Sequence, residues 1–514
     1  MPLTDAIFDD PLAASRLPGV RNRKRAAVAV AAAVVITVGA TVYASRAVRT
    51  GTGAGTATKT TLPYDPHELI VGYSGSASAL IAEVDTKTSL GVTLSSHPEL
   101  TPNEQLLRLP AGVRPVEAAA QIRLLPGVIS ALPDYIARIA GQWFPDDPGR
   151  AKRIHGWESL QWNFLSKAGV NAPQAWANLL ADHRPGATGV VIAVVDTGIA
   201  FRNWKTFDQS PDFRGTKFID PCDLVAGSIK DGRCTDPYAL DRESHGTFVA
   251  GTIAEATNNN YGVTGLAYRA SVMPVRVLDA EGNGDSSTIA AGIRYAVVHG
   301  AQVINLSIEF SPGTTSGQIP DVVSAITYAH NHGVVVVGAA GNDEDNTVDF
   351  PAALPDVISV GATTRDRCLA LYSDIGKSLD LVAPGGGDDA TSVTDSRCFS
   401  QRTLPDIYQM TFGNPQHPDQ FGFPRGWFGT SMAAPDVTAA AAMVIASGVL
   451  GRHPTPAQIQ DRLEATAHPL GNGEPNNAYG YGLVNIGAAT RRGGPLVPTK
   501  PYGLPGANTT RVVR

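Results

Sequence analysis

The sequence is poor in charged residues, and this scarcity limits the classes of protein to which it can belong. Charged residues make up 17% of the 514 residues, with 41 basic residues against 47 acidic ones. The small acidic excess gives no reason to expect nucleic acid as a partner. Hydrophobic residues make up 43%, which is enough for a large core and unlike a disordered chain. The length suggests more than one domain.

Cysteine is also scarce, and the four cysteines form two groups that are close in sequence. Cys222 lies near Cys234, and Cys368 lies near Cys398. No CxxC motif or neighbouring histidine accompanies them, so a zinc site is not expected. More than one pairing is open. We favour the two local disulfides, since each closes one loop, and free buried thiols are the alternative. Disulfides would agree with export from the cytoplasm.

Long apolar runs are absent except near the N-terminus. Residues 1–25 end in a basic cluster, and residues 26–44 carry no charge. This stretch predicts either a cleaved signal peptide or an uncleaved transmembrane anchor, with a buried core helix as a further alternative. Basic residues before the span predict a cytoplasmic N-terminus and a secreted or membrane-anchored remainder outside the cytoplasm. The membrane is a partner only if residues 26–44 are kept.

Composition and periodicity divide the rest of the chain. Residues 45–63 are rich in Thr, Gly and Ala and indicate a linker. Residues 64–140 alternate strand and helix patterns, which predicts a small α+β domain. Residues 141–160 are expected to form a second linker. Residues 491–514 are rich in Pro and Gly and are expected to form a flexible tail.

The segment 161–490 has the pattern of an α/β domain. Short apolar runs alternate with helical patterns, which predicts a mainly parallel sheet buried on both faces. There are no internal repeats. A Gly-Gly-Gly tract at 385–387 lacks the strand and helix context of a nucleotide-binding loop. The expected strands lie within 189–196, 271–278, 301–308, 333–340, 356–362 and 379–384, and the expected helices within 244–256, 287–299, 320–332, 430–448 and 455–466.

Three polar residues lie where such a sheet would form a site. Asp196 ends an apolar strand, and ligands bind beyond the carboxyl ends of parallel strands. His245 and Ser431 each begin a helical pattern. Taken singly, the aspartate could be structural and the serine a helix cap. Taken together, they can form a nucleophile, a base that removes its proton and a carboxylate that orients the base.

The segments around these residues resemble the active-site blocks of subtilisin-like (S8) serine peptidases. The segments are IAVVDTG, HGTFVAGTIA and GTSMAAPDV, in the order Asp, His, Ser that is typical of subtilisin. The resemblance extends from about Gln161 to Ala489. It implies a three-layer α/β sandwich in which Asp196 orients His245, His245 acts as general base and then acid, and Ser431 attacks the scissile carbonyl. The Gly-x-Ser-x-Gly motif of α/β-hydrolases is absent.

A fourth block, VVVVGAAGN at 334–342, resembles the family segment that carries the oxyanion hole. The resemblance implies that the Asn342 side chain and the Ser431 backbone N–H bind the developing oxyanion. It also implies that Ala340 and Gly341 lie at the substrate.

The substrate-pairing segment departs from the family pattern. Ser307 begins a segment that would pair with the substrate backbone. The family usually has Ser-Leu-Gly-Gly there, whereas this chain has Ile308, Glu309 and Phe310. Glu309 either favours a basic substrate residue or is a solvated charge at the rim. The family commonly has histidine at two further positions, where this chain has Phe248 and Asp436.

The resemblance extends to a structural calcium loop, although the chemistry itself needs no cofactor. Asn259 would supply a side-chain oxygen, and Gln161 would supply another. Carbonyl oxygens would come from Thr257, Tyr261 and Val263. An ordinary Asn/Gly turn is the alternative. The family's aspartate ligand after Asp196 has no clear counterpart in the sequence.

In this context the small domain at 64–140 resembles an inhibitory propeptide. We therefore expect a serine endopeptidase that acts on proteins or peptides and is made as a zymogen. The propeptide would be an intramolecular inhibitor, and the chain would cut itself within about 137–162. A permanent accessory domain and a catalytically silent peptide-binding relative are the alternatives. The insert at 392–425 has no interpretation from the sequence.

Overall fold

The computed structural model describes residues 64–74, 84, 88–94, 103–135, 141–150, 155–390, 398, 404–472 and 475–498. The predictions for residues 1–25, 26–44 and 45–63 lie outside this part of the chain. Among the described residues, no helix combines the length and the apolar character that crossing a membrane requires.

The first described unit is a small α+β sheet. Its four antiparallel strands lie in the order β2-β3-β1-β4. Helix α2 begins with Pro115 and buries Ala118, Ala119 and Ile122 together with Leu69 of β1, because these apolar positions recur at helical spacing. The elements are β1 (Tyr64–Tyr73), β2 (Thr93–Leu94), β3 (Glu104–Arg108), α2 (Pro115–Ile122) and β4 (Val128–Tyr135).

The second unit is organised by a large sheet whose neighbouring strands pair in parallel. The order β14-β13-β12-β11-β5-β10-β6, with β7 also beside β10, puts β5 near the centre. The six longer strands match the apolar runs of the sequence, because both faces of the sheet are covered. The strands are β5 (Val191–Asp196), β6 (Lys217–Phe218), β7 (Cys222–Asp223), β10 (Ser271–Arg276), β11 (Val303–Leu306), β12 (Val335–Ala339), β13 (Val357–Thr363) and β14 (Leu381–Pro384).

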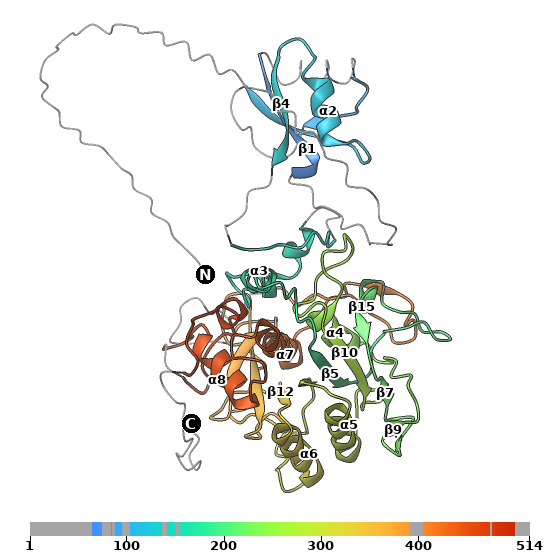
Figure 1. Cartoon of the computed structure of the whole chain (residues 1–514), viewed down its shortest axis with the longest axis vertical. Helices are drawn as coiled ribbons and strands as arrows, with labels where there is room; N and C mark the ends of the chain where they lie inside the picture. Colours follow the sequence, from blue (N-terminus) through green and yellow to red (C-terminus); the bar gives the residue numbers. More distant parts are fainter. Residues whose placement is uncertain are drawn as a thin grey trace, which may run out of the picture. The chain divides into compact units, whose positions relative to one another are not determined.

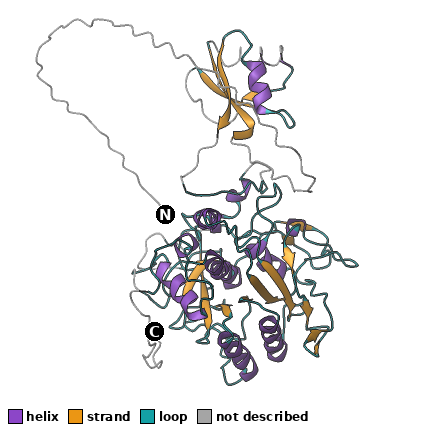
Figure 2. Cartoon of the chain, viewed as in Figure 1, coloured by secondary structure: helices purple, strands orange, loops and turns teal. Residues whose placement is uncertain are grey.

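Helices cover the two faces of this sheet and form a three-layer sandwich (Figure 1, Figure 2). Alternate residues of β5 belong to different cores. Val194 belongs to the core that includes residues of α3, α4, α7 and α8, whereas Val195 belongs to the core that includes residues of α5 and α6. The helices are α3 (Ala172–Ala181), α4 (His245–Ala254), α5 (Ser286–Val298), α6 (Pro320–Asn331), α7 (Thr430–Ser447), α8 (Pro456–Thr466) and α9 (Ile486–Ala489). The three-layer α/β sandwich with a mainly parallel sheet that was expected from the sequence is confirmed.

Short elements complete the unit. A hairpin of β15 and β16 lies in the insert that had no interpretation from the sequence, and it buries Phe412. A second hairpin, of β8 and β9, ends at Cys234. These elements are β8 (Ile229–Lys230), β9 (Arg233–Cys234), β15 (Thr411–Phe412), β16 (Phe421–Gly422) and the 3₁₀ helices η1 (Gly156–Ser159), η2 (Trp162–Phe164) and η3 (Pro211–Phe213).

Two disulfides join the cysteines as the two local pairs favoured from the sequence. The Cys222–Cys234 bond links β7 to β9, with an S–S distance of 2.01 Å. The Cys368–Cys398 bond has an S–S distance of 2.04 Å. The four cysteines are therefore all paired.

The segment 141–150 was expected to be a linker, but it packs against the large α/β unit. The Trp143 N–H donates to the Pro173 carbonyl at 3.0 Å, and the Trp143 ring contacts Trp176 edge-on. Asp147 is fully buried, and its carboxylate accepts the N–H groups of Asn258 and Asn259. The linker prediction rested on the local composition of this segment. Composition does not reveal these contacts, because the residues that the segment contacts are distant in sequence.

The start of the expected flexible tail is also held in place. The buried Arg462 donates to the carbonyls of Ala489, Arg491 and Pro495. Residues 491–495 are thus anchored to α8, whereas residues 499–514 lie outside the described part of the chain.

Candidate active site

The expected catalytic carboxylate lies at the carboxyl end of a central strand. Asp196 is the last residue of β5 and has no exposed surface. Its Oδ1 atom accepts the N–H of Thr197 at 2.7 Å and lies 2.8 Å from Nδ1 of His245. A buried carboxylate held in this way fixes the orientation of the imidazole.

Helix α4 presents His245 at its first position, and Asp241 organises the turn that precedes it. The buried Asp241 carboxylate accepts the Thr197 hydroxyl at 2.9 Å and the N–H groups of Ser244 and Thr247 at 2.9 and 2.8 Å. It thereby ties the turn after β5 to the start of α4. Sequence reasoning did not identify Asp241, because the DRESHG segment carries no signal that separates this acid from solvated ones.

The electrostatic surroundings favour a positive His245. Burial lowers the pKa of His245, but the charge and hydrogen bond of Asp196 and the charges of Glu243 and Asp241 raise it more. The result is a pKa of about 9. Glu243 also accepts the backbone N–H of His245 at 2.7 Å. The site therefore stabilises the imidazolium that forms when a base takes a proton.

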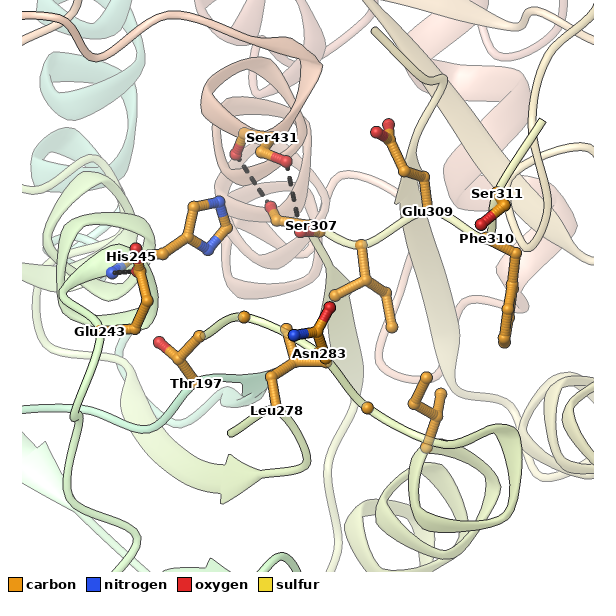
Figure 3. A pocket seen from close by; sticks show the side chains of 14 residues that line it. Thr197, Glu243, His245, Leu278, Asn283, Ser307, Glu309, Phe310, Ser311 and Ser431 are labelled. Carbon is orange, nitrogen blue, oxygen red and sulfur yellow. Dashed lines mark hydrogen bonds between the residues drawn. The ribbon is translucent and has the colours of Figure 1, made fainter. Parts of the chain in front are cut away.

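Ser431 lies at the start of α7 and is paired with Ser307. The Ser431 hydroxyl donates to the Ser307 carbonyl at 3.2 Å, and the Ser307 hydroxyl donates to the Ser431 carbonyl at 2.9 Å. Gly429 precedes this turn with φ of 148°, a conformation that favours glycine. The two serines bring the end of β11 and the first turn of α7 into contact (Figure 3).

His245, Ser307 and Ser431 line one cavity of about 440 Å³ (Figure 3). Its other lining residues are Thr197, Glu243, Leu278, Gly282, Asn283, Gly284, Ile289, Ile308, Glu309, Phe310 and Ser311. Ile308 is therefore among the residues that line this cavity. Ala340 and Gly341 are buried and are absent from this lining set.

Asn342 follows β12, and both the oxygen and the nitrogen of its side-chain amide form hydrogen bonds. Its Oδ1 accepts the Thr430 N–H at 2.8 Å, and its Nδ2 donates to Oε2 of Glu309 at 2.9 Å. Partial desolvation and the charges of Asp343 and Asp349 raise the pKa of Glu309. In Figure 3 the Glu309 side chain points away from Leu278 and Asn283. Glu309 is exposed, but it is not a free rim charge.

The residues expected to bind calcium are engaged in other contacts. Oε1 of Gln161 accepts the Thr264 N–H at 2.9 Å, and Oδ1 of Asn259 accepts the Tyr261 N–H at 2.8 Å. The N–H of Val263 donates to Asp212 at 2.8 Å. These hydrogen bonds use backbone N–H groups, so they leave open the expected role of the Thr257, Tyr261 and Val263 carbonyl oxygens. Calcium binding at this loop stays a prediction.

Three buried acids around this loop escaped sequence reasoning. They are Asp147, Asp212 and Glu255. Burial raises the pKa of Asp147 to about 7 and raises the pKa of the other two well above their usual range. Asp212 comes from the divergent loop after Asp196, where spacing alone could not align it with a family pattern.

Comparisons with known proteins agree on the family. The model of the subtilase family matches residues 187–482. Subtilisin NAT of Bacillus subtilis subsp. natto is 38% identical over 320 residues, which are 60% of this chain and 68% of that protein. Subtilisin of Bacillus pumilus is 37% identical over 60% of this chain and 94% of its own length. A solved protease structure from Pseudoalteromonas arctica is 30% identical with a TM-score of 0.52, covering 68% of this chain and 99% of that one.

The chain therefore belongs to the subtilase family, a family of serine-type peptidases.

Proposed function

We propose that this protein is a serine endopeptidase that hydrolyses peptide bonds in proteins through an acyl-enzyme on Ser431. The observation that carries the proposal is the 2.8 Å contact between His245 Nδ1 and Asp196 Oδ1, beside a cavity that His245 shares with Ser431. This arrangement supplies a nucleophile, a base and an orienting carboxylate at one place.

In the first half of the reaction, Ser431 attacks the scissile carbonyl carbon. His245 Nδ1 faces Asp196, so Nε2 is the ring nitrogen that takes the Ser431 proton as the Ser431 Oγ–carbon bond forms. Asp196 stabilises the resulting imidazolium. The imidazolium then gives its proton to the leaving amine as the C–N bond breaks. Water then gives a proton to His245 Nε2 as it attacks the acyl carbon. His245 passes this proton to the Ser431 oxygen as the ester C–O bond breaks.

The oxyanion of the tetrahedral intermediate would receive hydrogen bonds from the Ser431 backbone N–H and from Asn342 Nδ2. The contact between Asn342 Oδ1 and the Thr430 N–H orients the amide. In the free protein, however, Nδ2 donates to Glu309. Nδ2 carries two N–H groups. We propose that the oxyanion displaces Glu309 from the N–H that it accepts, so that the two acceptors compete.

We further propose that residues 64–140 are an inhibitory propeptide and that the chain cuts itself during maturation. The packing of Trp143 and Asp147 within the peptidase unit supports a cut before Trp143, within residues 136–142. The two disulfides support an extracytoplasmic location for the peptidase unit.

The test compares the intact mass of the chain lacking residues 1–44 with that of its Ser431→Ala variant. We expect the parent, and not the variant, to lose the residues before the cut and to react with a fluorophosphonate probe at Ser431. If neither protein shortens and the probe fails to label the parent after trial cleavage by another protease, the catalytically silent alternative is correct.

A further inference from the structure

Glu309 occupies a hydrogen-bond donor that the proposed reaction needs. Its Oε2 atom accepts from Asn342 Nδ2 at 2.9 Å, and Asn342 Oδ1 accepts the Thr430 N–H at 2.8 Å. The second contact fixes the amide, so Nδ2 stays at the position from which it would bind the oxyanion. In the free protein, one N–H of this amide is therefore already bound to a carboxylate.

The residue that makes this contact is a departure from the family pattern. Subtilisin-like peptidases usually have Ser-Leu-Gly-Gly in this segment, whereas Glu309 stands in place of the first glycine. A glycine has no side chain that could accept from Asn342. The contact is therefore a property of this chain, and its consequence for substrate choice has to come from Glu309 itself.

The cavity at Ser431 carries negative side chains on two sides. Among the described residues that line it, Glu243 and Glu309 are acidic and none is lysine or arginine. In Figure 3 the two glutamates lie on opposite sides of Ser431. Glu243 Oε2 accepts the His245 N–H at 2.7 Å, whereas Glu309 is exposed. Glu309 is thus the carboxylate that an entering substrate can reach and move.

Further carboxylates next to Glu309 strengthen its attraction for a cation. Asp343, Asp349 and Asp374 converge, with one oxygen of each within 4.8 Å of the other two. The charges of Asp343 and Asp349, together with partial desolvation, raise the pKa of Glu309. These surroundings destabilise the ionised carboxylate, so a cationic side chain stabilises it more than it would an isolated acid.

We propose that Glu309 makes this enzyme selective for substrates with arginine, and to a lesser extent lysine, at the residue that supplies the scissile carbonyl. The guanidinium pairs with both carboxylate oxygens of Glu309, and this pairing draws Oε2 away from Asn342 Nδ2. The freed N–H then binds the oxyanion. With an uncharged residue at this position, the oxyanion has to displace the carboxylate itself, so acylation of Ser431 is slower.

The position of the cationic residue follows from the same contact. The scissile carbonyl oxygen would lie at Asn342 Nδ2, which is the atom that donates to Glu309. The side chain of that substrate residue begins two bonds from the carbonyl carbon, so a long cationic side chain can reach the carboxylate. The selectivity rests on the proposed function, because it needs Asn342 as an oxyanion donor.

The test compares two peptide substrates that differ only in having arginine or citrulline before the scissile bond. Citrulline is close to arginine in size but carries no charge. The fluorophosphonate probe titrates active Ser431 in the self-processed chain, and single turnovers at saturating substrate give the acylation rates. We expect the arginine peptide to acylate Ser431 about fivefold faster, the effect of one net hydrogen bond, with a smaller gain for lysine over norleucine. A carboxylate that only attracts the cation would lower KM and leave the two rates equal.

Two variants separate the charge of Glu309 from its contact with Asn342. Glu309→Gln keeps an oxygen that can accept from Asn342 but loses the charge, so the ratio of the two rates should fall to about one. Glu309→Gly removes the acceptor as well, so both peptides should react at about the rate that the arginine peptide has in the parent. The matched control is Asp345→Asn, an exposed acid of the loop after Asn342, which should leave the ratio unchanged.

Several outcomes would overturn the proposal. Equal rates for the two peptides in the parent would do so, as would a ratio that survives Glu309→Gln. Loss of the ratio in Asp349→Asn, with Glu309→Gln unaffected, would assign the cation to the buried aspartates instead. A preference for arginine only at another substrate position would contradict the placement. If the probe labels no Ser431 at all, the proposed function fails first, whereas labelling with equal rates overturns this inference alone.

Discussion

At the scale of single residues, charges around His245 control the pH at which the proposed base is active. A positive imidazole cannot take the Ser431 proton, so activity should rise as the pH passes the pKa of His245. Because Asp196, Glu243 and Asp241 together raise this pKa from 6.5 to about 9, we expect the acid limb of kcat/KM to lie above pH 6.5. The measurement is the pH profile of kcat/KM with a peptide substrate.

The matched variant for this profile is Glu243→Gln. It keeps an oxygen that can accept the His245 N–H but removes a charge that raises the pKa of His245. The acid limb should therefore move to lower pH. A limb that stays in place would show that Glu243 does not act on His245 electrostatically.

The contact between Glu309 and Asn342 predicts a competition at the proposed oxyanion hole. Glu309→Gly removes the carboxylate that accepts the Asn342 Nδ2 donor. We expect kcat for uncharged substrates to rise by about fivefold, which corresponds to one net hydrogen bond of about 1 kcal/mol. Single-turnover and steady-state kinetics measure this change.

The control removes the donor itself. Asn342→Ala should lower kcat by about 10²–10³-fold, the size of effect that the matching asparagine has in subtilisin. In the Asn342→Ala background, Glu309→Gly should then bring no gain. An equal gain in both backgrounds would mean that Glu309 acts elsewhere.

At the scale of elements, α7 carries a buried acid, Asp436, whose effect on the free energy of unfolding depends on pH. Asp436 has no exposed surface, and burial raises its pKa well above the usual 3.8, against a smaller opposing contribution from Asn163. Between 3.8 and this higher pKa, the folded state holds a proton that the unfolded state has released. Stability should therefore fall as the pH rises through this window.

Asp436→Asn removes that proton equilibrium without changing the size of the side chain. In the Ser431→Ala background, we expect the variant to be more stable than its parent at pH 8. Its free energy of unfolding should also lack the part of the pH dependence that comes from Asp436. Urea unfolding at pH 5 and pH 8 measures both free energies. The same slope in parent and variant would contradict the assignment of a neutral Asp436.

At the scale of the whole molecule, packing of the segment 141–150 predicts where the mature chain begins. Trp143 and Asp147 are part of the peptidase unit, so losing them would expose Trp176 and leave the N–H groups of Asn258 and Asn259 without this acceptor. We expect N-terminal sequencing of the self-processed protein to start within 136–142 or at Trp143. A start after Trp143 would contradict this.

Much of the large unit could be predicted from the sequence, because its signals are local. Strands buried on both faces appear as apolar runs, so β5, β10 and β12 were found within a few residues. Helix α3 was missed, and so was the hairpin of β15 and β16, whose two-residue strands are too short to show a period.

The sequence by itself determined the family, the parallel sheet and the candidates Asp196, His245 and Ser431, because each lies in a short block with its own pattern. Only the tertiary structure decided which side chains meet across long separations. Asp241 reaches back to Thr197, Glu309 accepts from Asn342, and Asp374 joins Asp349 beside Gly341. Such contacts depend on how loops at the carboxyl ends of parallel strands converge. Residue patterns are local, so they do not predict where these loops converge.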